Sequence, residues 1–132
     1  MQITHVKIVS LPVADQERAK NWYLDKLGFG LRTDSPLGEN QRWVEVAPIG
    51  AQTSLALVTW FPNMPPGSVQ GLVLATDDIE EAHRLLSARG VQFHGPIETA
   101  PWGRYSSFAD PDGNGWVLQQ DTSFGQSQEV EK

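Results

Sequence analysis

The chain has 132 residues, enough for one domain with a core of its own, and a net charge of −6 with only 10 Lys and Arg residues. The absence of Cys excludes disulfides, thiolate zinc sites and a cysteine nucleophile. The basic residues are scattered, and no apolar stretch approaches the roughly 18 residues of a membrane span, so we expect no nucleic-acid or membrane partner. Because the N-terminus has no signal pattern, we expect a cytoplasmic protein.

The first half of the chain predicts one strand, one helix and three further strands. Residues 3–13 are rich in β-forming residues, and Asp15 stands where a helix N-cap is expected. Apolar residues then recur at helical spacing until Gly28, which is typical of a helix end. Three strand candidates follow: "GFGLRTD", "RWVEVAP" and "TSLALVTW".

The second half repeats this order after a proline-rich connector at residues 61–68. "QGLVLATD" predicts a strand, and Asp77 or Asp78 caps a helix that ends at Gly90. His83 is expected on the solvated surface of this helix. Three strands are then predicted, in "VQFHG", "RYSSFAD" and "GWVLQQ", and residues 121–132 form a polar tail.

The repeat indicates a duplication within a single domain of residues 1–120. We place the first βαβββ module at about residues 1–60 and the second at about residues 68–120. Each helix covers one face of its own sheet, so the other face needs a partner. Two such modules placed together would enclose a cavity between their sheets.

A tight turn precedes the last strand, in "ADPDGNG" at residues 109–115. Proline fixes φ for a turn, glycine and asparagine accept positive φ, and aspartate bonds to its own backbone. The turn therefore fixes where the strand with Trp116, Val117 and Leu118 begins.

Three segments resemble the vicinal oxygen chelate superfamily, which contains glyoxalases, bleomycin-resistance proteins and extradiol dioxygenases. They are "LPVADQERAKNWYLDKLGFGLRTD", "ATDDIEEAHRLLSARGVQF" and "PWGRYSSFADPDGNGWVLQQ", and the match spans about residues 3–120. The resemblance implies an α+β fold in which two βαβββ modules pair to form a curled sheet around a central cleft. It also implies a homodimer.

Enzymes of this superfamily hold a divalent metal with His and Glu side chains from both modules. Carried over by motif, these ligand positions fall on Ile8, Ser54, Gly71 and Val117. None of the four is a strong metal donor, so we predict no metal site and no cofactor. His5 is the alternative ligand, and only a strand bulge would turn it inward.

Large aromatic residues suggest a different use for the cleft. Trp43, Trp60 and Trp102 lie on segments that bound it, although each ring could instead fill the core or a dimer interface. Glu45 shares a strand face with Trp43 and is a candidate polar anchor or base, and His94 is a weaker catalytic candidate. The predicted lining of the cleft is Ile8, Trp43, Glu45, Ser54, Trp60, Gly71, Trp102, Arg104 and Val117.

Three functions remain open from the sequence. The first is metal-independent binding of a small organic molecule, such as an aromatic one, in the cleft. The second is a divergent lyase, isomerase or dioxygenase-like enzyme that uses a displaced metal site or a metal-free base. The third is a pure interaction module.

Overall fold

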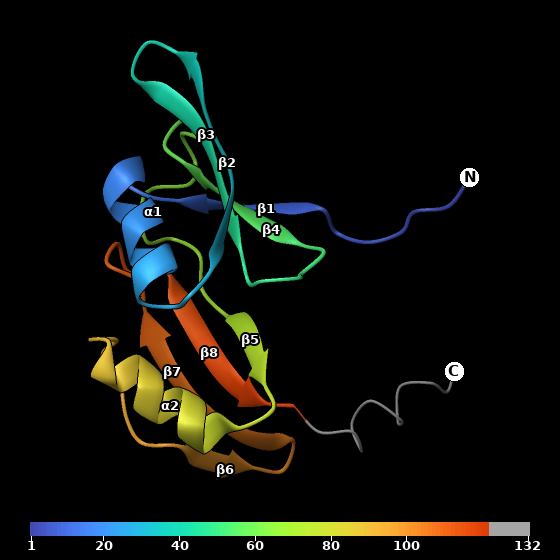
Figure 1. The fold of residues 1–132 in the computed structure, drawn as a ribbon, viewed down its shortest axis with the longest axis vertical. Coiled ribbons are helices and arrows are strands. Elements are labelled where there is room, and N and C mark those ends of the chain that lie inside the picture. The colour runs from blue at the N-terminus through green and yellow to red at the C-terminus, as the bar shows by residue number, and fades with distance from the viewer. Residues whose placement is uncertain (122–132) are drawn as a thin grey trace. The chain divides into compact units, whose positions relative to one another are not determined.

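The computed structural model describes residues 1–121 and contains two compact units. Unit 1 comprises residues 1–70 and 110–114, and unit 2 comprises residues 71–109 and, within the described part of the chain, residues 115–121. Each unit holds one helix and one four-stranded sheet (Figure 1). Neither helix is long and apolar enough to cross a membrane. Apart from residue 121, the predicted polar tail lies outside the described residues.

Unit 1 contains β1 (Ile8–Pro12), α1 (Gln16–Asp25), β2 (Gly30–Gly38), β3 (Gln41–Ala47) and β4 (Ser54–Val58). The strand order in its sheet is β1-β4-β3-β2, with β1 and β4 parallel and the other pairs antiparallel. This is the βαβββ order predicted from the sequence.

Helix α1 begins and ends as its sequence indicates. The side chain of Asp15 accepts a hydrogen bond from the backbone N–H of Arg18 at 3.0 Å, which is an N-cap contact. Gly28, just beyond the helix, has φ 74°, a conformation that glycine adopts without the strain that a Cβ brings. The helix buries Ala19 and Tyr23 against the sheet, where Val44 and Leu57 are fully buried.

Unit 2 contains β5 (Leu72–Thr76), α2 (Ile79–Ala88), β6 (Glu98–Ala100), β7 (Gly103–Ala109) and β8 (Gly115–Gln120). Its strand order, β5-β8-β7-β6, repeats that of unit 1, and the two strands β5 and β8 are again parallel. Asp78 caps α2 by accepting from the backbone N–H of Glu81 at 3.1 Å. The predicted α+β fold of two βαβββ modules is confirmed.

Two local predictions in unit 2 were wrong. The strand expected in "VQFHG" is absent: Phe93 makes an isolated bridge to Phe108, and β6 lies further along the chain at Glu98–Ala100. Gly95 and Pro96 interrupt the extended segment, which explains the shift. His83 is not on a solvated surface but half-buried, with its ring stacked on Phe93 at a centroid distance of 4.0 Å.

The turn before β8 is an integral part of unit 1. Asp110 is buried, and its carboxylate accepts hydrogen bonds from Tyr23 Oη at 2.7 Å and from the backbone N–H of Asn114 at 2.9 Å. The Asn114 side chain, fully buried, donates to the carbonyl of Pro12 at 2.8 Å. Asp112 accepts from the backbone N–H of Ala14 at 3.1 Å. These hydrogen bonds therefore hold the turn against the end of β1, the loop that follows it and α1.

Candidate functional site

The candidate site lies on the far face of the first sheet, which we define as the face turned away from α1. Strand alternation sends Val44, Val46, Leu55 and Leu57 toward the helix, and sends Trp43, Glu45 and Ser54 to the far face. Glu45 is the Cα partner of Ala56, and Ser54 is the Cα partner of Ile8. Strands β1, β3 and β4 thus bring Ile8, Glu45 and Ser54 to the same face.

The Glu45 carboxylate is the polar centre of this face. It accepts hydrogen bonds from Trp43 Nε1 at 2.9 Å and from Ser54 Oγ. The hydrogen bond from Ser54, with a smaller contribution from Trp43, holds the pKa of Glu45 below its ordinary value, although burial acts in the opposite direction. Glu45 is therefore an ionised, half-buried acceptor at neutral pH.

An aromatic platform, formed by Trp43, Trp60 and Phe61, adjoins this carboxylate. The ring centroids of Trp43 and Trp60 are 6.2 Å apart, and those of Trp60 and Phe61 are 6.3 Å apart. Trp43 and Trp60 are half-buried, and Phe61 is 45% exposed, so ring surface remains for further contacts. Flat rings of this kind bind other flat apolar groups by burying large areas.

The resemblance implies that the superfamily's metal-ligand positions fall on Ile8, Ser54, Gly71 and Val117. Ile8 and Ser54 are neighbours on the far face, where one supplies a hydrocarbon chain and the other a hydroxyl that donates to Glu45. In unit 2, Val117 pairs with Val73, and Gly71 lies just before β5. Within residues 1–121, no group of three or more His, Cys, Asp or Glu side chains is placed to hold a metal ion.

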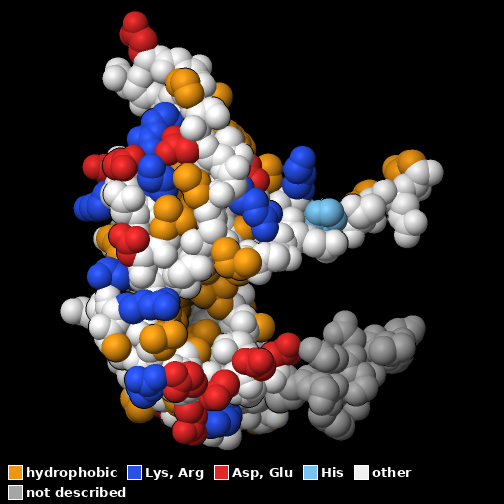
Figure 2. All heavy atoms as spheres, in the orientation of Figure 1, with side chains coloured by type: hydrophobic (Ala, Val, Ile, Leu, Met, Phe, Trp, Pro, Cys, Tyr) orange, Lys and Arg blue, Asp and Glu red, His pale blue; other side chains and the backbone are white. Residues whose placement is uncertain are grey.

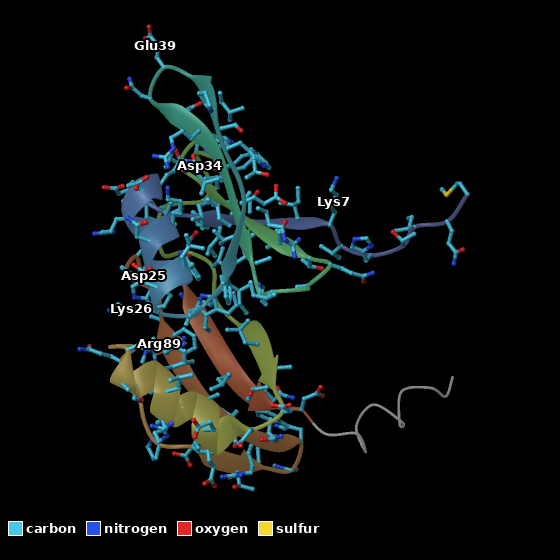
Figure 3. All side chains as sticks on the ribbon, viewed as in Figure 1. Lys7, Asp25, Lys26, Asp34, Glu39 and Arg89 are labelled. Atoms are coloured by element: carbon cyan, nitrogen blue, oxygen red, sulfur yellow. The ribbon has the colours of Figure 1, made fainter. Side chains whose placement is uncertain are left out.

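The opposite side of the first sheet carries a charged cluster. Asp34 accepts from Arg42 Nε and Nη2, both at 2.9 Å, and from Lys20 Nζ at 2.8 Å, while Arg42 also donates to Glu17 at 2.8 Å. These hydrogen bonds, from Arg42 first, lower the pKa of Asp34 to about 2. Figure 2 shows blue and red side chains gathered on the α1 side of unit 1, and Figure 3 places Asp34 beside that helix.

A cavity of about 580 Å³ lies next to this cluster. It is lined by residues 14–17 at the start of α1, by the β2–β3 hairpin and by Thr59. Its charged lining residues are Glu17 and Arg42, which pair with each other, and Asp15, which caps α1. A charged lining of this kind is a poor match for an apolar ligand. The aromatic platform does not contribute to its lining.

The remaining predicted cleft residues belong to unit 2. Trp102 is 59% exposed and lies against Tyr105 at a centroid distance of 4.8 Å. Arg104 instead donates to Glu80 of α2 at 2.7 Å, so its guanidinium lies on the helix side of the second sheet. The prediction that the nine residues line one cleft between the modules stays a prediction.

The two histidine candidates show few contacts. His5 precedes β1 and is exposed, with its ring Nδ1 2.9 Å from the hydroxyl of Thr4. His94 is exposed, and its backbone N–H donates to the carbonyl of Ser107 at 2.8 Å. Neither histidine forms part of the Glu45 network, and the roles suggested for them stay predictions.

Sequence reasoning missed two aromatic neighbours. Phe61 follows Trp60 directly but lies in the predicted proline-rich connector, and Tyr105 lies in the strand predicted in "RYSSFAD". The adjacency of Phe61 to Trp60 is a usable signal, because two large apolar side chains next to each other in a loop can form an exposed apolar patch, which is informative about function. The contact between Trp102 and Tyr105 depends on the turn that joins β6 and β7, which the sequence did not locate.

Several known proteins are similar to this chain over nearly its whole length. The crystal structure of TnmS3, an antibiotic binding protein from Streptomyces sp. CB03234, is similar with 52% identity and a TM-score of 0.85 over 92% of this chain and 99% of that one. A superfamily member from Sphaerobacter thermophilus DSM 20745 is 40% identical, with a TM-score of 0.83 over 90% of this chain and 98% of that one. The uncharacterized protein YetH of Bacillus subtilis (strain 168) is 34% identical over 122 residues, 89% of this chain and 99% of YetH.

A family model also matches residues 2–118, which cover both βαβββ modules. The match agrees with the resemblance carried by the helix and turn motifs, and with the fold. The chain belongs to the Glyoxalase/Bleomycin resistance protein/Dioxygenase superfamily.

Proposed function

We propose that this protein binds an antibiotic-like small organic molecule without a metal ion, and that flat parts of the ligand pack on the aromatic platform of unit 1. The observation that carries the proposal is the platform itself, which adjoins an ionised carboxylate on the sheet face that also presents Ile8 and Ser54. The name of the similar protein TnmS3, an antibiotic binding protein, supports the ligand class.

Binding is better supported than catalysis by the chemistry of Glu45. A general base works best when its pKa is raised toward the working pH, whereas hydrogen bonds from Ser54 and Trp43 lower the pKa of Glu45. The carboxylate is therefore a weak base and a good fixed acceptor. The proposal does not use His5 or His94.

Ile8 and Ser54 also favour burial of organic surface over metal binding. A catalytic divalent site requires about three strong protein ligands, and these positions supply none in unit 1. Apolar surface removed from water contributes roughly 25 cal/mol per Å² before the costs of association. Ligand binding should therefore survive removal of metal ions.

The first prediction concerns chelation and uses tryptophan fluorescence. A panel of planar aromatic antibiotics is titrated into the purified protein with and without excess EDTA, and the dissociation constants are compared. We expect saturable binding with the same constant in both conditions, because the contacts are rings and one carboxylate. Stoichiometric metal on the purified protein, or loss of binding in EDTA, would contradict the proposal.

A matched pair of variants tests the platform. Trp60→Leu removes its central ring and should weaken binding about fivefold or more, since aromatic pairs contribute roughly 0.5–1.5 kcal/mol beyond their buried area. Trp22→Leu is the same substitution on α1, where the ring packs against Tyr23 at 4.9 Å. It should leave affinity unchanged. Equal effects of the two substitutions would refute a role for the platform.

A further inference from the structure

We infer that the proposed site selects flat aromatic molecules that carry a protonated nitrogen, and that Glu45 sets this preference. The inference rests on the proposed function, because it assigns chemistry to the same face of the first sheet. It concerns the polar group of the ligand, which the aromatic platform alone does not determine.

The first step is the hydrogen-bonding capacity that Glu45 has left. An ionised carboxylate has about four lone-pair sites, and two of them are used by Trp43 Nε1 and Ser54 Oγ. The remaining sites accept hydrogen bonds and cannot donate. Because the two neighbouring donors are already directed at the carboxylate, a ligand group that reaches Glu45 has to be a donor.

The second step is that, among residues 1–121, no cationic side chain forms an ion pair with the Glu45 carboxylate. Lys7 and Arg32 act on it only as more distant charges, and the Arg32 guanidinium donates to the carbonyl of Ala51. A half-buried carboxylate without a cationic partner favours a cationic ligand.

The third step is that the aromatic platform and the net charge of the chain both favour a positively charged ligand. The faces of indole rings attract cations, and Trp43, which donates to the carboxylate, lies against Trp60. The chain has a net charge of −6, which attracts cations at longer range and repels anions. An aromatic cation would therefore gain from the rings, from Glu45 and from the overall field.

Two planar tricyclic probes of opposite charge test the inference by calorimetry. Proflavine carries amino groups and a positive charge, and anthracene carboxylate carries a negative charge. We expect proflavine to bind at least tenfold more tightly. Glu45→Gln should weaken proflavine binding about fivefold to tenfold, since hydrogen bonds to charged groups exceed neutral ones by about 1 kcal/mol.

Two control variants separate local charge from general effects. Glu39→Gln makes the same change in net charge at the exposed tip of the β2–β3 hairpin (Figure 3), and should change proflavine affinity less than twofold. Ser54→Ala keeps the charge of Glu45 and should keep the preference for the cation. Circular dichroism checks that all three variants are folded.

The outcomes distinguish this inference from the proposed function. Equal affinity for the two probes, or equal effects of Glu45→Gln and Glu39→Gln, overturns the inference while aromatic binding itself stands. Failure of both probes to bind contradicts the proposed function, and the inference falls with it. A tighter cation whose affinity depends on Glu45 supports both.

Discussion

At the scale of single residues, carboxylates on the two faces of the first sheet have different partners. Glu45 on the far face is held by two neutral donors, Ser54 and Trp43, and keeps its charge available. Asp34 on the helix side is enclosed by Arg42 and Lys20, so its charge is neutralised within the protein. The first arrangement suits ligand recognition, and the second suits stability.

The Asp34 cluster predicts a dependence of stability on pH. The pKa of Asp34 in the folded protein is about 2, below its ordinary value of 3.8, so the stabilisation is present above about pH 4 and is lost as the pH falls toward 2. Asp34→Asn should lower the free energy of unfolding by roughly 0.5–1 kcal/mol at neutral pH, because solvent screens the cluster. In urea titrations the difference from wild type should vanish near pH 2, and a difference independent of pH would contradict this account.

At the scale of elements, the 110–114 turn explains why the chain reverses so firmly before β8. Its side chains satisfy backbone groups of β1 and of the loop before α1, as well as backbone groups of the turn itself. Asn114 also accepts from the backbone N–H of Val69, just after the connector, at 3.2 Å. The turn therefore organises unit 1 in addition to setting where β8 begins.

Glycine substitutions test how closely the connector approaches this turn. A Cβ at Gly67 would overlap the backbone carbonyl of Asp112, and Gly67 has φ 85°. Gly67→Ala should therefore reduce the free energy of unfolding by about 3 kcal/mol or more. Gly50 has φ 81° with no atom within 4 Å of an added Cβ, so Gly50→Ala isolates the backbone effect. It should lose only about 1–2 kcal/mol in the same urea titration, and equal losses would exclude the close approach.

At the scale of the whole molecule, each sheet has edge strands and exposed apolar residues. The edges are β1 and β2 in the first sheet and β5 and β6 in the second. Val73 on β5 is 56% exposed and Leu31 on β2 is 48% exposed. Unpaired edges with apolar side chains favour association with another chain.

We therefore predict a homodimer, whose closed symmetry would bury such surface in both copies. Light scattering at micromolar concentration should give twice the chain mass of 14.6 kDa. Val73→Lys, which places a charge on the β5 edge strand, is expected to shift the mass toward the monomer if this edge lies in the interface. A wild-type protein of monomer mass would refute the dimer.

The sequence by itself determined the order of elements, the two capped helices, the tight turn and the superfamily. These features depend on residues close together in the chain: Asp15 caps the residues that follow it, and Gly28 ends the same helix. It also indicated Trp43, Glu45, Ser54 and Trp60 as residues of one predicted cleft, with Trp43 and Glu45 on the same strand face, but it did not predict their hydrogen bonds.

Only the tertiary structure decided which of these candidates meet. Ser54 reaches Glu45 because β3 and β4 pair in one register, and a shift of one residue would send either side chain to the other face. The partners of the 110–114 turn lie about a hundred residues earlier in the chain, as in the contact between Asn114 and Pro12. Contacts over such separations depend on how packed elements share a core, which local periodicity and capping do not encode.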